Sequence, residues 1–183
     1  MPRLLFQACC LLVVWLTWAG HVTAQRTTID EREVKAVFIF NFVQFVEWPP
    51  DAFDSPESPF TIGVLGDDPF GSLLDEAVKG EVVKGRPLLV ARFRRVEDIK
   101  TCHVLFVSPS EAGMYEQILA ALRTRPTLTV GETESFTSRG MIRFLTERNR
   151  VRLEVNVGAV KAAGLTISSN LLRAARIVGS TKG

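Results

Sequence analysis

Apolar residues recur at helical spacing between residues 34 and 48: Val34, Val37, Phe38, Phe42, Phe45 and Val46. Asp30 precedes this run as a candidate N-cap, and Glu33 follows three residues later, as in a capping box. Trp48 stands directly before Pro49, and proline disfavours the α conformation in the residue before it. The pattern predicts a helix from Asp30 to Trp48. Because apolar side chains also occupy its other sides, we expect this helix to be buried on more than one face.

Short apolar runs and helical stretches alternate through the middle of the chain. The runs predict strands over 60–65, 88–93, 104–107 and 127–130. Helices are expected over 72–79 and from Ser108 to about Arg123. The strands are continuously apolar and do not alternate, which is typical of a largely parallel sheet covered on both faces.

The last third of the sequence changes to an alternating pattern. Residues 141–145 predict a strand, and residues 147–149 a turn. Residues 150–156 then place Val151, Leu153 and Val155 on one face and Arg152, Glu154 and Asn156 on the other, which predicts an antiparallel hairpin with one wet face. Asn156 can also cap a short helix that ends near Gly164. Ser168 and Ser169 begin a final helix, whose expected inner stripe is Leu171, Leu172, Ala175 and Ile177.

These elements predict an α/β fold. We expect a mostly parallel central sheet flanked by helices on both faces, with a C-terminal antiparallel hairpin.

The first 24 residues have the three parts of a secretory signal peptide. Arg3 is the only charge, residues 4–18 are apolar except Gln7 and Thr17, and Val22-Thr23-Ala24 offers a cleavage site before Gln25. A membrane anchor is the alternative, but the run is shorter than the roughly 20 residues that span a bilayer. We therefore expect cleavage after residue 24, a single domain over 25–183, and a periplasmic protein without a stable membrane anchor.

Composition and charge narrow the possible chemistry. The chain of 183 residues has a net charge of +2, and loss of Arg3 lowers this by one, so no broad field favours nucleic acid. Cleavage also removes Cys9, Cys10 and His21, which leaves Cys102 and His103. One cysteine excludes an internal disulfide, and a structural zinc site needs about four ligands. We expect no metal, no cofactor and no catalytic residues. Strand packing is the expected role of Cys102 and His103, although Cys102 is able to cross-link two chains in an oxidising compartment.

Two further segments invite a ligand-binding interpretation. Asp67 and Asp68 follow a predicted strand, where doubly wound sheets bind ligands. The segment lacks the Gly-Lys-Ser/Thr ending of a phosphate loop, and a phosphoacceptor site needs another acid after Val107, where Ser108 and Pro109 stand. We interpret residues 66–71 as a turn. The basic residues between Lys84 and Lys100 are interpreted as solvated strand ends.

Three surfaces remain as candidate partner-binding sites. They are the polar face of residues 150–156 (Arg152, Glu154 and Asn156), an exposed helix end (Glu47 and Trp48), and the carboxyl end of a strand (Asp67 and Asp68).

Taken in order, several segments resemble the YfiR-like family of periplasmic proteins. The segments are 33–42 with 45–49, 62–71, 102–108, 128–132, 151–156 and 163–169, so the likeness covers nearly all of residues 25–183. The resemblance implies an α/β sandwich that tends to dimerise and acts as a periplasmic regulator. Its best-known member represses a membrane-bound diguanylate cyclase, which lowers cyclic di-GMP and disfavours biofilm. Relatives carry cysteine pairs that form disulfides, whereas Cys102 has no partner, so redox control through an internal disulfide does not transfer.

The leading hypothesis is an exported, non-enzymatic regulator that binds the periplasmic part of a membrane signalling protein, either a diguanylate cyclase or a sensor kinase, and that forms a homodimer. The second is a periplasmic small-ligand sensor with a pocket near residues 66–70 or beside the aromatic helix. The third is an exported hydrolase that depends on His103.

Overall fold

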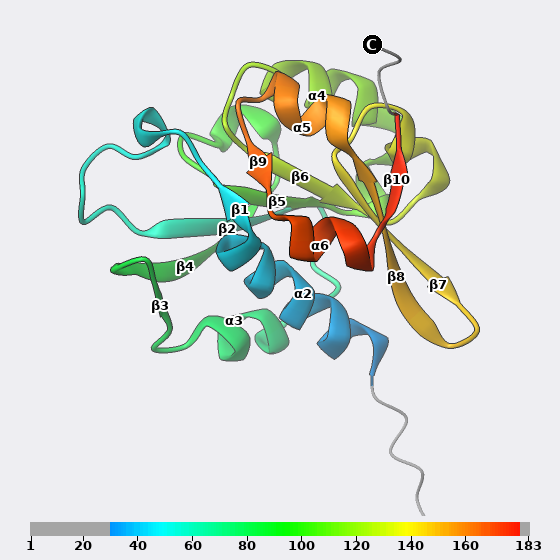
Figure 1. Ribbon diagram of the computed structural model, residues 1–183, viewed down its shortest axis with the longest axis horizontal. Helices are drawn as coiled ribbons and strands as arrows, with labels where there is room; N and C mark the ends of the chain where they lie inside the picture. Colours follow the sequence, from blue (N-terminus) through cyan, green and yellow to red (C-terminus); the bar gives the residue numbers. More distant parts are fainter. Residues whose placement is uncertain (1–29, 180–183) are drawn as a thin grey trace, which may run out of the picture.

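The computed structural model describes residues 30–179, whose chain folds into an α/β structure around a mixed sheet of mostly parallel strands (Figure 1). The sheet consists of β2 (Phe60–Leu65), β3 (Val82–Val83), β4 (Arg86–Phe93), β5 (Val104–Val107), β6 (Leu128–Gly131), β7 (Ile142–Glu147), β8 (Arg150–Asn156) and β10 (Arg176–Val178). Their spatial order is β10-β8-β7-β6-β5-β2-β4-β3, and the β3–β4 and β7–β8 pairs are antiparallel. The α/β class, the mostly parallel sheet and the antiparallel hairpin are as predicted.

The central strand β5 shows why the continuous apolar runs become parallel strands. All four of its residues are buried. Val104 and Phe106 belong to one hydrophobic cluster, and Leu105 and Val107 belong to a second. Because successive side chains of a strand point to opposite faces, the two clusters lie on the two faces of the sheet.

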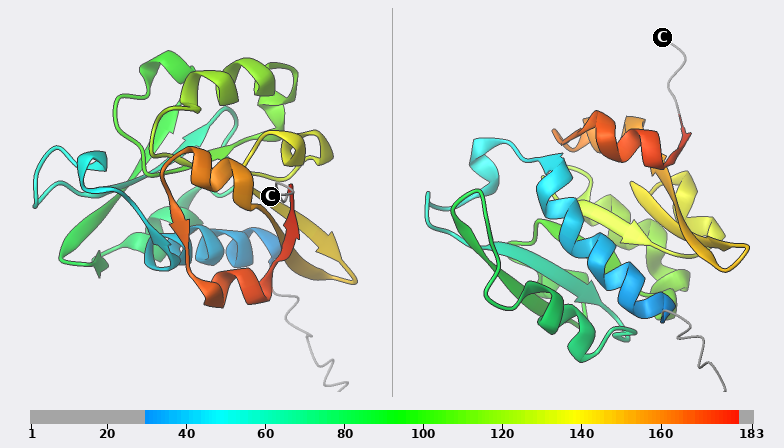
Figure 2. Two further views of the ribbon diagram at one scale, coloured as in Figure 1. Left: turned by 45° about the horizontal axis from the view of Figure 1, so that its top comes forward. Right: turned by 60° about the horizontal axis from the view of Figure 1, so that its bottom comes forward.

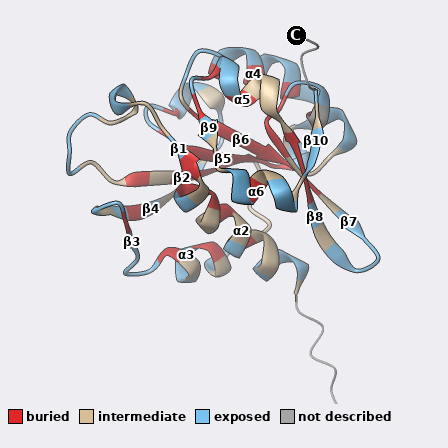
Figure 3. Cartoon of the chain, in the orientation of Figure 1, coloured by how far each residue is buried: buried red, intermediate tan, exposed pale blue. Residues whose placement is uncertain are grey.

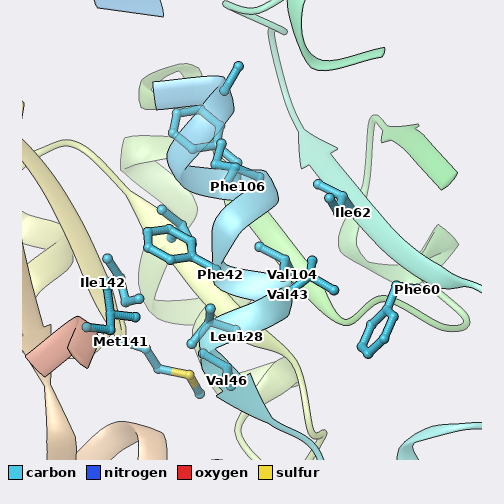
Figure 4. Packing of buried hydrophobic residues seen from close by; sticks show 14 of the residues in the cluster. Phe42, Val43, Val46, Phe60, Ile62, Val104, Phe106, Leu128, Met141 and Ile142 are labelled. Carbon is cyan, nitrogen blue, oxygen red and sulfur yellow. The ribbon is translucent and has the colours of Figure 1, made fainter. Parts of the chain in front are cut away.

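Helix α2 (Glu31–Phe45) packs across the face that carries the first cluster (Figure 2). Asp30 is its N-cap and accepts a hydrogen bond from the backbone N–H of Arg32. Phe42 and Val43 are fully buried against side chains of the sheet such as Val104 (Figure 4). Full burial of one such side chain stabilises the fold by about 1.5–3 kcal/mol.

The predicted helix is confirmed at its start but not at its end. It stops at Phe45, because Val46 takes extended backbone angles. Val46 and Glu47 form β1 (Val46–Glu47), which pairs antiparallel with β9 (Thr166–Ile167). Pro49 restricts only Trp48 directly, so the pairing of Val46 and Glu47 with β9 explains why the helix ends earlier than predicted.

The remaining helices are shorter. Helix α3 (Ser72–Val78) packs beside α2, and α4 (Tyr115–Leu122) buries Tyr115, Ile118, Leu119 and Leu122 in the second cluster. The stretch before α4 is a 3₁₀ helix, η3 (Pro109–Met114), so the α-helix begins later than the predicted Ser108. The other 3₁₀ segments are η1 (Pro50–Ala52), η2 (Val96–Asp98) and η4 (Glu134–Ser138).

The C-terminal segment corrects the expected final helix. Helix α5 (Val157–Ala162) is capped by Asn156 as predicted, and α6 (Ser169–Ala174) follows. The chain then becomes β10, which pairs parallel with β8, and Ile177 is 52% exposed rather than part of an inner stripe. The helical spacing was misleading here because residues 176–178 gain an edge position on the sheet.

Candidate functional site

The β7–β8 hairpin extends past the rest of the sheet. Only Ile142 and Arg143 of β7 pair with β6, so the strand continues from Phe144 to Glu147 beyond that neighbour. Arg148 and Asn149 form the turn with positive φ angles of 52° and 59°, as two-residue hairpin turns require. The hairpin therefore projects as an arm, and its tip is exposed (Figures 1 and 3).

One face of this arm carries arginine side chains. The cross-strand pairs Glu147–Arg150, Leu145–Arg152 and Arg143–Glu154 lie on the same face. The opposite face holds Phe144 and Leu153, which are buried in the first cluster. The hairpin thus separates an apolar side that anchors it from a charged side that faces away from α2.

Both carboxylates of the hairpin are bonded within the protein. Glu154 is only 5% exposed and accepts hydrogen bonds from Arg143 Nε at 2.8 Å and from Arg176 Nη1 at 3.1 Å. Glu147 accepts a hydrogen bond from Arg176 Nη2 at 2.8 Å. These contacts form a chain of ion pairs, Arg143–Glu154–Arg176–Glu147, across three strands.

Three other arginines of the hairpin take no part in this chain of ion pairs. They are Arg148, Arg150 and Arg152, here called the arginine trio. All three are exposed, and none of their side chains has a hydrogen-bond or ion-pair partner among residues 30–179. Between residues 142 and 156 the sequence has four arginines and two glutamates, so this segment has a net charge of +2. That equals the net charge of the whole chain. Guanidinium groups bind carboxylate or phosphate with two parallel hydrogen bonds, so the trio is suited to holding an anionic partner.

The three residues nominated on β8 therefore separate into different roles. Arg152 belongs to the trio, as expected of a wet face. Glu154 does not face water, because β10 lies beside β8 and brings Arg176 against its carboxylate. Asn156 is half-buried, and its side-chain oxygen accepts a hydrogen bond from the N–H of Ala159 at 3.0 Å as the cap of α5. The single wet face was wrong because the sequence pattern did not reveal β10.

Glu47 and Trp48 also differ from the prediction, since they do not lie at a helix end. Glu47 is exposed on β1. Trp48 is half-buried, and its ring lies edge-on to Phe60 at 5.4 Å and to His103 at 6.2 Å between centroids. The indole thus contributes to packing over the start of β2, and only Glu47 remains available on this surface.

Asp67 and Asp68 are held in the turn that the sequence predicted. Asp68 accepts hydrogen bonds from the N–H of Phe70 at 2.7 Å and from Arg92 Nε at 2.8 Å. The N–H of Asp67 donates to Ser110 Oγ at 3.0 Å. A Cβ atom placed on Gly66 would lie 2.4 Å from that same Oγ. Side chains of the segment that follows β5 therefore fill the space next to Gly66. A ligand entering the crevice between β2 and β5 would need that space.

His103 and Cys102 are enclosed in the protein. The N–H of Thr61 donates to His103 Nδ1 at 3.0 Å, so Nε2 carries the proton and donates to the carbonyl of Ala52 at 3.1 Å. Burial lowers the pKa of His103 to about 4 and raises the pKa of Cys102 to about 12. A neutral imidazole with both nitrogens bonded and a protonated, buried thiol are not positioned for acid–base or nucleophilic chemistry.

Residues 30–179 contain neither a metal-binding cluster nor a helix able to span a membrane. No group of three or more His, Cys, Asp or Glu side chains in residues 30–179 is arranged to hold a metal ion. In the same range, no helix has both the length and the apolar character needed to cross a bilayer.

Comparisons with known proteins agree with this fold. The search of curated proteins gave no match. A crystal structure of a conserved domain protein from Vibrio cholerae O1 biovar El Tor str. N16961 superimposes with a TM-score of 0.53 at 15% identity. The match covers 80% of this chain and 60% of that protein, so this chain spans less than two thirds of the other's length, and the likeness concerns the fold alone.

The family comparison is more specific. The YfiR/HmsC-like family matches residues 32–176, a range that omits only Glu31 of α2 and Ile177 and Val178 of β10 among the helices and strands. The YfiR-like family is one of periplasmic regulators and is not known for enzymatic activity. The chain belongs to the YfiR/HmsC-like family.

Proposed function

We propose that this protein is an exported, non-enzymatic regulator that binds the periplasmic part of a membrane signalling protein. The partner we favour is a diguanylate cyclase, which the protein represses. In this proposal residues 1–24 are the signal peptide, which lies outside the described residues, and residues 25–183 form one periplasmic domain. Family membership and the arrangement of the polar side chains support the proposal.

One observation carries it: the arginine trio remains available to a partner, whereas the reactive side chains of Cys102 and His103 are buried. The arginine trio is exposed, and the two hairpin carboxylates are already engaged by Arg143 and Arg176. His103 is buried with both ring nitrogens bonded to the backbone. Such a molecule is built to hold a partner rather than to transform a substrate.

The arginine trio makes an acidic surface on the signalling protein the natural counterpart. Complementary charges at the rim of an interface steer association and are screened by salt. We therefore expect binding to weaken as the ionic strength rises.

The test is recovery of the partner from envelope extract with the tagged mature protein. We expect a membrane signalling protein to be recovered by the native chain and lost when Arg148, Arg150 and Arg152 are all changed to Gln. A matched control changes Lys79, Arg94 and Lys100 to Gln, which removes the same charge from exposed positions elsewhere. The control should recover the partner as the native chain does.

Cyclic di-GMP distinguishes the class of partner. Deletion of the gene should raise cyclic di-GMP, and the trio variant should fail to restore the lower level. If a sensor kinase is recovered and cyclic di-GMP is unchanged, the partner is a kinase and not a cyclase. Absence of any partner together with unchanged cyclic di-GMP would contradict the proposal.

We also propose that the protein forms a homodimer, as the family resemblance implies. Two apolar side chains near the β3–β4 edge support a protein contact there: Val82 is 60% exposed and Leu89 is 53% exposed. Val82 pairs with Pro87, two residues before Leu89, so both side chains lie on one face. Leu89→Glu should lower the mass measured by light scattering to that of a monomer. Val37→Glu, at an exposed position on α2, is the control and should leave the mass unchanged.

A further inference from the structure

A groove is lined by residues of α4 and α5 and by Thr129 of β6. Its volume is about 510 Å³, within the range of roughly 300–1,000 Å³ in which proteins bind small molecules. Small residues create the gap, since Ala120 lines it from α4 and Gly158, Ala159 and Ala162 line it from α5. Larger side chains at these positions would close the space between the two helices.

The lower part of the groove is apolar but contains one buried hydroxyl. Leu119 and Met141 contribute apolar atoms and are largely buried. Thr129 is 2% exposed, and its Oγ1 accepts a hydrogen bond from the N–H of Met141 at 3.3 Å. No acceptor within residues 30–179 takes the proton of this hydroxyl. A buried donor without an acceptor is costly, and an oxygen atom of a ligand would satisfy it.

The rim of the groove carries a surplus of positive charge. Arg139 pairs with Glu116 at 2.9 Å, and both line the groove. Arg123 lines it as well, is exposed, and has no ion-pair partner in the described part of the chain. The guanidinium group of Arg123 is therefore available to bind an anion. Unlike the arginine trio, it lies beside apolar side chains.

We propose that this groove binds a small organic carboxylate with a short apolar body. Arg123 receives the carboxylate, and the alanine walls with Leu119 and Met141 hold the hydrocarbon part. Inorganic phosphate would leave the apolar walls unused, and a neutral alcohol would leave Arg123 unpaired. This site is separate from the arginine trio and does not depend on the proposed function.

Octanoate and octanol are suitable probes because they differ only in the charged group. In amide NMR spectra of the mature protein, octanoate should shift resonances of α4 and α5 in a saturable manner. Octanol should bind about tenfold more weakly, a ratio typical of the loss of one charge-assisted hydrogen bond. Arg123→Gln should weaken octanoate by a similar factor and leave octanol unaffected. Arg94→Gln, at an exposed position remote in sequence, is the charge control and should bind octanoate normally.

Neighbouring alanines on α4 provide a steric test. Ala120 lines the groove and Ala121 does not, although both are exposed. Ala120→Trp should abolish octanoate binding, and Ala121→Trp should preserve it. Ala162→Trp fills the groove from α5 and should repeat the loss if Ala120→Trp unfolds. The proposal is overturned by the absence of saturable shifts in the native protein, by equal binding of octanol and octanoate, or by binding that survives both groove-filling variants.

Discussion

Two regions of the molecule use their charged side chains differently: the carboxyl ends of β2, β4 and β6, and the β7–β8 hairpin. Near the carboxyl ends of β2 and β4, Arg92 bonds both Asp68 and Asp75. Near the end of β6, Lys35 bonds Glu132 and Glu31. At the hairpin, the carboxylates are engaged by Arg143 and Arg176, and the arginine trio remains exposed to water. At the strand ends these charged side chains pair with one another, whereas the hairpin leaves three guanidinium groups exposed.

Burial explains part of this difference. Burial lowers the pKa of Lys35, but its hydrogen bonds to Glu132 and Glu31 outweigh this and raise the pKa above its ordinary value. A half-buried ammonium needs such partners to stay charged. The trio is exposed and fully hydrated, so the fold does not require partners for it. The charges of the trio are not needed for folding, so they are free to serve in binding a partner.

The largest expected effect concerns the anchor of the hairpin. Phe144 is fully buried and stacks on Phe42 of α2 with 6.0 Å between the ring centroids. Phe144→Ala should lower the free energy of unfolding by about 3–5 kcal/mol, because it leaves a cavity between β7 and α2. Chemical denaturation measures this change. Val151→Ala, at a half-buried position nearer the tip, should cost less than half as much, and equal losses would contradict an anchor centred on Phe144.

A second effect concerns the buried His103, which lies directly before β5. The pKa of His103 is about 4 when folded, against about 6.5 when unfolded, so the unfolded chain takes up the proton first as the pH falls. Stability should therefore decrease by about 3 kcal/mol between pH 6.5 and pH 4, and His103 should contribute no further decrease below that range. Denaturation curves across this range measure the slope. His103→Gln keeps a donor and an acceptor but does not titrate, so its slope should be shallower, and an unchanged slope would assign the effect to other groups.

The third effect separates the internal ion pairs of the hairpin. Glu154→Gln removes the charge between Arg143 and Arg176 and should cost about 2 kcal/mol, because the carboxylate is buried while Arg176 is partly exposed. Glu147→Gln breaks an exposed pair with the same Arg176 and should cost under about 1 kcal/mol. Equal costs measured by denaturation would show that burial does not distinguish these two carboxylates.

The sequence predicted the main strands because they are buried on both faces. Residues 60–65 and 104–107 form strands with the predicted bounds, since a run of apolar residues there has no competing period. Residues 150–156 also form a strand with the predicted bounds, and there the signal is the alternation of apolar and polar residues. The caps Asp30 and Asn156 were also identified correctly, because a cap depends on the side chain and its nearest neighbours.

The errors lie where a partner from elsewhere in the chain decides the structure. Val46 becomes a strand only because Ile167 pairs with it, and Ile177 does so only because Val155 pairs with it. No local pattern shows either partner, and β10 in turn buries Glu154. The groove lined by α4 and α5 was missed for the same reason, since no local pattern shows that Ala120 and Ala159 line one groove in the folded chain.

The smallest expected change in stability comes from an exposed arginine of the trio. It distinguishes the trio from the arginines that form ion pairs within the protein. Arg143 and Arg152 lie on the same face of the hairpin, one bonded to Glu154 and the other exposed without a partner among residues 30–179. Arg152→Gln should change the free energy of unfolding by no more than about 0.5 kcal/mol, as is usual for surface substitutions. Arg143→Gln should cost more, because it leaves the carboxylate of Glu154 with fewer donors. If both substitutions cost the same in denaturation experiments, the trio belongs to the fold rather than to a partner. A stable Arg152→Gln protein that binds its partner less well would instead show that the fold keeps this charge exposed for docking.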